Sequence, residues 1–308
     1  MADLVAVEDF TYRQKIVNLI PAMLAIGIVG LLIIAGAPDQ APDLDRLTRR
    51  IGDYGWNGVA VLTLGSVFLA LLLEPFELGT VRFLEGYWSS TGWLHRAAVL
   101  GVWLQERKRS RLQWIFRTAT DDARRQEVSA KLSALPMQQP LMPTQLGNTL
   151  RGMEERAGAP YELDAIYAWP RLYEALPEQT LKKVGEARNQ LDVAARLCLS
   201  LATSAVIATV ILAPHGWWLL APLGLLLLAI AAYRAAIAAA MIYGDTICSV
   251  IDVHRLKLLQ MMRLEMPLTL DKEREINKIL AELWAREFSA AGDLKYSRTD
   301  SDVGLHHR

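Results

Sequence analysis

The chain has 308 residues, of which 52% are hydrophobic, and its 33 basic and 33 acidic side chains leave no formal net charge. A neutral chain has no overall attraction for nucleic acid, so we expect no nucleic-acid partner. Its apolar residues concentrate in four stretches, Ile16–Ala37, Trp56–Leu73, Leu197–Ala213 and Trp217–Tyr233. About 20 apolar residues cross a hydrocarbon core as a helix. The sequence therefore predicts an all-α, polytopic membrane protein with four transmembrane helices in two hairpins.

The four stretches divide the chain into five segments. The first transmembrane hairpin is expected at residues 1–76, with spans at about 16–37 and 56–75, and the second at 196–241. A helical cytosolic domain at 77–195 separates them. C-terminal cytosolic helices at 242–291 and a disordered polar tail at 292–308 complete the prediction.

Basic residues indicate the orientation in the membrane. Residues 77–196 contain 17 Lys and Arg and the segment after Tyr243 contains 10, whereas the loop between the first two stretches has three arginines among four aspartates. Positively charged loops stay on the cytosolic side. We therefore expect the plasma (inner) membrane as the location, with both termini and the middle segment cytosolic and both hairpin turns outside. The first stretch is too long for a secretory signal and favours an uncleaved anchor.

An amphipathic helix is predicted at Trp93–Phe116. Its apolar side chains share one side and precede a basic run at 107–111; they are Trp93, Ala97, Leu100, Trp103 and Leu104. Two interpretations remain open. The helix either lies on an anionic lipid leaflet or packs against the cytosolic domain.

The remaining helices are predicted from caps and from apolar residues three and four positions apart. One of about 35 residues begins at Pro177-Glu178 and runs directly into the third span. The fourth span likewise continues into the cytosol. Two other helices are expected at about Asp121–Leu135 and at Lys272–Phe288, and a third begins at Gln145 with Thr144 as its N-cap.

Three short segments carry a motif: Pro143–Asn148, Trp169–Tyr173 and Asp252–Leu258. They resemble a family of uncharacterised prokaryotic multi-spanning membrane proteins. That family shares Pro-Thr-x-Leu-Gly-Asn…Trp-Pro-Arg-Leu-Tyr before the third span and Asp-x-x-Arg-x-x-Leu after the fourth. The resemblance covers roughly residues 143–267. It implies a membrane topology and brings no activity with it.

Charged residues border the spans on the side expected to be cytosolic. Glu74 and Glu77 follow the second span, and Arg234 follows the fourth. A charge inside hydrocarbon suggests function, whereas a charge at the interface is tolerated when it is paired or snorkels. We predict an ion pair between Arg234 and Glu74 or Glu77. An ion pathway is the alternative interpretation.

Five polar residues in the motif region form a candidate ligand pocket. Arg171 would suit an anion, because its guanidinium donates two parallel hydrogen bonds. The alternative is that these residues cap helices and form ion pairs that fix the geometry between helices. The five residues are Asn148, Arg151, Glu154, Asp164 and Arg171.

The leading functional hypothesis is an oligomeric ion channel or pore-forming assembly gated by its cytosolic domain. Small and hydroxylated residues recur every four positions in the third span, at Ser200, Ser204 and Ala208. Such a spacing allows close helix packing, and the same hydroxyls could line a pore. The alternative is a membrane-anchored scaffold or signalling protein with a cytosolic protein partner and no permeation.

The sequence supports an enzyme least. It contains no phosphate-binding loop, nucleophile elbow or zinc-protease motif. We therefore predict no catalytic residue, no metal ligand and no cofactor. The expected partners are the lipid bilayer, further copies of the chain and a cytosolic protein.

Overall fold

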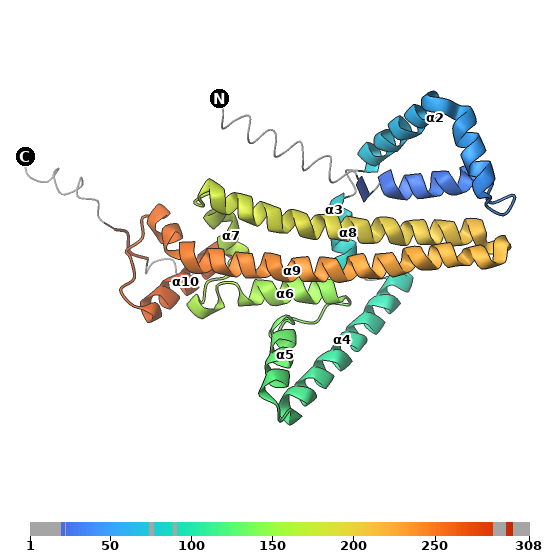
Figure 1. Cartoon of the computed structure of the whole chain (residues 1–308). Coiled ribbons are helices and arrows are strands. Elements are labelled where there is room, and N and C mark those ends of the chain that lie inside the picture. Colours follow the sequence, from blue (N-terminus) through green and yellow to red (C-terminus); the bar gives the residue numbers. More distant parts are fainter. Residues whose placement is uncertain (1–19, 22, 74–76, 89–90, 286–293, 298–308) are drawn as a thin grey trace, which may run out of the picture. The chain divides into compact units, whose positions relative to one another are not determined.

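The computed structural model describes residues 20–21, 23–73, 77–88, 91–285 and 294–297. These residues are helical apart from turns and one isolated bridge between Leu264 and Tyr296 (Figure 1). The all-α prediction is therefore confirmed for them. In chain order the helices are Met23–Ile34, α2 (Leu44–Leu73), α3 (Glu77–Glu85), α4 (Gly92–Thr118), α5 (Asp122–Ser133), α6 (Gln145–Arg156), η2 (Ala159–Tyr161), α7 (Ala165–Tyr173), α8 (Glu178–Leu212), η3 (Ala213–Leu219), α9 (Leu220–Met261) and α10 (Leu270–Trp284).

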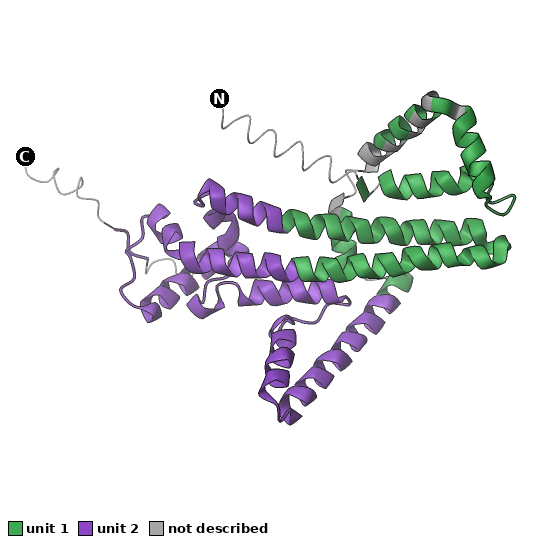
Figure 2. Cartoon of the chain, in the orientation of Figure 1, with its two compact units in different colours: residues 1–95, 188–239 green, residues 96–187, 240–308 purple. Residues whose placement is uncertain are grey.

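The chain forms two compact units (Figure 2). Unit 1 comprises residues 1–95 and 188–239, so it includes the first predicted membrane hairpin and all but the last two residues of the second. Unit 2 comprises residues 96–187 and 240–308, which include the three motif segments. Two helices, α8 and α9, contribute residues to both units.

One helical stretch, Glu178–Met261, is long and apolar enough to cross a membrane. Its most apolar window has a mean hydropathy of 2.2, and only 33% of that window is buried. An apolar helix with most of its surface uncovered indicates membrane association. The stretch contains the third and fourth predicted spans, because the chain reverses at Gly216, whose φ of 50° suits glycine. The total of four transmembrane helices stays a prediction.

Small side chains bring α8 and α9 close together in this hairpin, where the two helices run side by side (Figure 1). Near its open end, Cys198 and Leu201 of α8 pack against Ala229 and Ala232 of α9. Near the turn, Ala208 and Leu212 are fully buried. Helices in lipid associate where small residues let their backbones approach.

The first hairpin contacts the second within unit 1. Ala37 packs against Ala208 and Leu212, and the Pro38 carbonyl oxygen lies 2.8 Å from Nε2 of His215. Closer to the middle of α8, Leu84 of α3 packs on the Cys198 cluster. The turns that follow the first and third predicted spans therefore lie at the same end of unit 1.

The first two predicted spans are described only in part. Residues 16–19 and 22 of the first lie outside the described residues. The second falls in α2, which begins at Leu44 and bends at Gly55, where φ is 55° and ψ is −162°. Beyond the bend, Val61, Leu64 and Phe68 are exposed. They form an apolar surface that suits contact with lipid.

Several predicted helix boundaries are confirmed. Thr144 caps α6, because its hydroxyl accepts a hydrogen bond of 3.0 Å from the Gly147 N–H. The helix predicted from Pro177-Glu178 is α8, which begins at Glu178 and has 35 residues. The helix predicted at Lys272–Phe288 is α10, which starts two residues earlier and ends at Trp284. Residues 286–288 lie outside the described part of the chain.

Enlarging Ala208 should separate α8 from its neighbours. Ala208 is 0% exposed, so Ala208→Phe has no space and should destabilise the protein by about 2 kcal/mol. Val206, on the same helix, is 66% exposed and provides the matched control Val206→Phe. Thermal unfolding in detergent measures both variants. Equal melting temperatures for the two would contradict this packing.

Candidate functional site

Asn148 is fully buried and connects α6 to the segment that precedes it. Its Oδ1 accepts a hydrogen bond of 2.7 Å from the Met142 N–H, while its Nδ2 donates to the carbonyl oxygens of Met142 and Thr144, both at 2.9 Å. Oδ1 and Nδ2 therefore both have partners within the chain. Asn148 thus holds the backbone of residues 142–144 against the start of α6, which is a structural role and not that of a ligand-binding residue.

Two further side chains of α6 bind the linker from Pro136 to Met142. Nη1 of Arg151 donates to the Pro140 carbonyl oxygen at 2.6 Å. The Glu155 carboxylate accepts hydrogen bonds from three successive backbone N–H groups, those of residues 137–139, at 2.5–3.2 Å. Asn148, Arg151 and Glu155 thus satisfy linker groups that no helix or sheet pairs. Glu155 is not among the five predicted pocket residues, because its partners are backbone atoms, which no residue type reveals.

The α7 residues of the candidate pocket also bind within their own element. Asp164 is the N-cap, and its carboxylate accepts from the N–H of Ile166 at 2.9 Å. Arg171 donates to the Tyr167 carbonyl oxygen at 2.6 Å, and its guanidinium lies 4.6 Å from the centroid of the Trp284 ring. Glu154 is exposed.

The arginine of the third motif segment forms a buried ion pair. Nε of Arg255 lies 2.7 Å from Oε1 of Glu273, whose side chain is 6% exposed. The Arg255 guanidinium also lies 3.8 Å from the Tyr161 ring centroid, and Asn277 donates to the Tyr161 carbonyl oxygen. These contacts join α9 and α10 to η2. These motif residues thus make contacts that hold the helices of unit 2 together.

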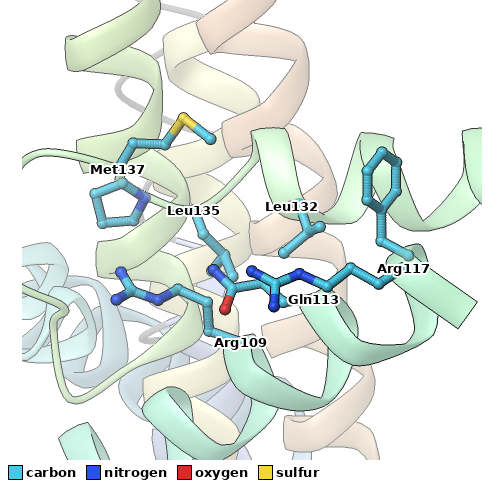
Figure 3. Close-up of a pocket in the computed structure, with 8 residues that line it drawn as sticks. Arg109, Gln113, Arg117, Leu132, Leu135 and Met137 are labelled. Atoms are coloured by element: carbon cyan, nitrogen blue, oxygen red, sulfur yellow. The ribbon is translucent and has the colours of Figure 1, made fainter.

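A pocket of about 420 Å³ lies between α4, α5 and the linker (Figure 3). Arg109, Gln113 and Arg117 line one side of it and lie on one side of α4, four residues apart. Apolar side chains lie opposite. None of the five predicted pocket residues lines it. The full lining is Arg109, Gln113, Phe116, Arg117, Leu132, Leu135, Pro136 and Met137.

The chemistry of this pocket suits a group that is both anionic and apolar. Arg109 and Arg117 make no ion pair with any residue in the described part of the chain. Leu135 is buried, whereas Met137 is 83% exposed and lies at the rim. Two free guanidinium groups favour a carboxylate or phosphate. Sequence reasoning noted the basic run and missed the pocket, because α5 and the linker reach it only through the tertiary fold.

An ionic cluster lies where α3 meets α8 in unit 1. Nε of Arg188 lies 3.1 Å from Oδ1 of Asp192, one helical turn later. Burial raises the pKa of Glu85 above its usual value, and the nearby charges of Arg188 and Arg82 lower it by less. The spacing of Arg188 and Asp192 was visible in the sequence, but the approach of Glu85 was not.

The predicted pair between Arg234 and Glu74 or Glu77 is not tested. Glu74 and the side chain of Glu77 lie outside the described residues. Arg234 is exposed.

Hydroxyl groups in the third predicted span bind their own helix. Thr203, Ser204 and Thr209 each donate to the carbonyl oxygen four residues earlier, at 2.7–2.9 Å. Ser204 is also buried. Their hydrogens therefore bond within the helix, while the oxygens of the exposed Thr203 and Thr209 keep their capacity to accept a hydrogen bond.

Known proteins give no further guide to the site. Comparison with protein-family models, with curated proteins and with solved structures finds no match. Among the described residues, no group of three or more His, Cys, Asp and Glu is placed to hold a metal ion. The resemblance of the motif to uncharacterised membrane proteins stays a prediction.

Replacing Asn148 by aspartate should destabilise unit 2. The new carboxylate would face the carbonyl oxygens of Met142 and Thr144 without a donor of its own, so Asn148→Asp should cost about 3 kcal/mol. Gln126→Glu adds the same charge at an exposed position of α5 and should be nearly neutral. Chemical denaturation monitors both variants. A tolerated Asn148→Asp would show that the clamp is unimportant.

The raised pKa of Glu85 predicts that replacing this residue by glutamine stabilises the protein, by an amount that depends on pH. A carboxyl group with a raised folded-state pKa stabilises the protein at low pH, and this contribution is lost as pH rises through that pKa. Glu85→Gln should therefore raise the melting temperature at pH 7, and the gain should shrink below pH 4.5. Glu186→Gln, at an exposed position of α8, is the control. A lower melting temperature for Glu85→Gln than for the unsubstituted protein at pH 7 would contradict the prediction. It would mean that the attraction between Glu85 and Arg188 exceeds the cost of burying the Glu85 carboxylate.

Proposed function

We propose that the chain is an integral membrane protein that anchors a helical interaction unit at the cytosolic face of the plasma (inner) membrane. In this proposal four transmembrane helices form two hairpins, both termini are cytosolic and the chain assembles as a homo-oligomer. The charge distribution along the sequence supports this orientation. The common end shared by the turns at Pro38 and His215 is consistent with it.

The amino-acid composition of the predicted spans favours an anchor over a channel. None of the four apolar stretches, Ile16–Ala37, Trp56–Leu73, Leu197–Ala213 and Trp217–Tyr233, contains a charged residue. Ion pathways are lined by carbonyl rings, charged side chains or polar groups. The three hydroxyls at Thr203, Ser204 and Thr209 already bind helix carbonyls. A membrane part of this kind favours anchoring without permeation, and the protein is not an enzyme in this proposal.

The interaction surface of the proposed anchor is in unit 2. Its pocket presents Arg109 and Arg117 opposite apolar side chains of α5 and the linker. A partner that inserts an acidic side chain next to an aliphatic or aromatic one would match both sides. We therefore propose a cytosolic protein as the partner.

A gated channel is the second candidate, and the continuity of two helices favours it. α8 and α9 each run without a break from residues of unit 2 into the apolar hairpin. A rearrangement of unit 2 could move the membrane part through such rigid helices. The pore would then lie between subunits, because the hairpin packs tightly within one chain.

Mass and flux measurements on one preparation separate the two candidates. In nanodiscs we expect a protein mass of at least two chains, each of 34.3 kDa. In liposomes loaded with a potassium-sensitive dye, we expect no flux above that of empty liposomes, while valinomycin serves as the positive control. Flux that scales with protein content would establish the channel. A strict monomer would contradict the homo-oligomer.

A further inference from the structure

One side of α4 packs against the segment at Pro143–Gln145 in unit 2. Gly101 lies so close to Pro143 that a Cβ atom there would sit 2.7 Å from the Pro143 carbonyl oxygen. About two helical turns later, Nζ of Lys108 donates to Oε1 of Gln145 at 2.8 Å. Burial is the main cause that lowers the pKa of Lys108, and Lys131 adds to it. The cytosolic-packing interpretation of this helix therefore holds for one of its sides.

A second side of α4, next to the packed one, is apolar and uncovered. No residue of α4 is buried, although the helix has 27 residues. At about 100° per residue, Trp103 lies on the far side of the helix from Gly101, whereas Leu104 lies about 60° from Gly101, on the flank of the packed side. Leu104 is nevertheless 51% exposed. The exposed apolar residues on this side are Trp93, Leu100, Trp103, Leu104 and Trp114.

Arginines alternate with these apolar residues on the same side. Arg96, Arg107 and Arg111 fall within the sector that holds the tryptophans. The Arg107 guanidinium lies 3.8 Å from the Trp103 ring centroid. None of the three makes an ion pair among the residues that the structure describes. The surface thus combines aromatic rings with positive charge that no acidic side chain of the described residues pairs.

Such a surface matches the headgroup region of an anionic membrane. Tryptophan prefers the interface between hydrocarbon and water, and basic side chains there extend toward phosphates. The helix has six basic residues and one acidic residue, Glu106. It also follows the second predicted span closely, with only α3 between them.

A second copy of the chain is a poorer occupant of this side. Symmetric pairing through it would place the arginines of one helix near those of the other, with Glu106 as the only acidic residue of α4 to offset them. Lipid phosphates would instead provide the opposite charge.

We propose that α4 lies on the anionic inner leaflet, with Trp93, Leu100, Trp103, Leu104 and Trp114 in the headgroup region and Arg96, Arg107 and Arg111 binding lipid phosphates. The inference goes beyond the proposed anchor, since it assigns a second, peripheral membrane contact to α4, which lies between the two hairpins in the sequence. It holds whether or not the protein conducts ions.

Spin labels on two sides of α4 test the proposal in the full-length protein. Cys198 and Cys248 are first replaced by alanine, and then Leu104→Cys or Glu106→Cys is labelled in nanodiscs. The discs contain phosphatidylcholine alone or with about one-third phosphatidylglycerol. With the anionic lipid, the label at 104 should become more accessible to oxygen and less accessible to a water-soluble nickel complex. The label at 106 should stay accessible to the nickel complex in both.

Charge variants separate lipid recognition from simple burial. Replacing Arg96, Arg107 and Arg111 together by glutamine should abolish the difference between the two lipid compositions at position 104. Arg124→Gln, on α5, should leave the difference unchanged. If the triple variant does not fold, the labelled protein that keeps its three arginines is measured at about 1 M salt, which shortens the Debye length to about 3 Å. The added salt should then abolish the same difference.

Three results would overturn the proposal. In one, the label at 104 is as accessible to water as the label at 106 in anionic discs. In the second, insertion is equal in both lipid compositions, so the arginines do not select anionic lipid. In the third, the label at 104 is already immobilised in detergent by a second copy of the chain. The first two results do not bear on the mass and flux measurements that test the anchor, and the third would identify this side of α4 as a contact between subunits.

Discussion

The close approach of α8 and α9 is the constraint on which unit 1 depends. Ala208, Ala229 and Ala232 provide surfaces flat enough for the two helices to meet, and Leu212 fills the space near the turn. The same packed surface receives Ala37 from the first hairpin and Leu84 from α3. In a lipid environment there is little hydrophobic driving force between helices, so this contact area and its dispersion attraction hold the unit together.

Unit 2 uses a different kind of interaction. Its helices are short, and its linker has backbone groups that no neighbouring strand or helix satisfies. Asn148, Arg151 and Glu155 bind those groups directly. The buried pair of Arg255 and Glu273 then connects α9 to α10. A buried polar network of this kind fixes one arrangement of helices, because every alternative arrangement leaves charged or amide groups without partners.

Helix α4 shows how one element can serve several surroundings. Gly101 and Lys108 face the rest of unit 2, Arg109 and Arg117 line the pocket, and the sector around Trp103 is left for the membrane in our proposal. Such a division explains why the helix is long and amphipathic and yet contains no buried residue. It also gives the anchor a basic, peripheral contact in addition to its hairpins.

The sequence by itself determined the helices and the apolar hairpin, because these depend on local caps and on residue spacing. Thr144 at the start of α6 and the 35 residues of α8 are examples. Only the tertiary structure decided how the polar residues are used. Asn148 and Arg151 resembled pocket residues, but their partners are backbone atoms of Met142 and Pro140, which no residue type reveals. The ligand-sized pocket likewise requires α5 to fold back on α4, a long-range contact that no local pattern encodes.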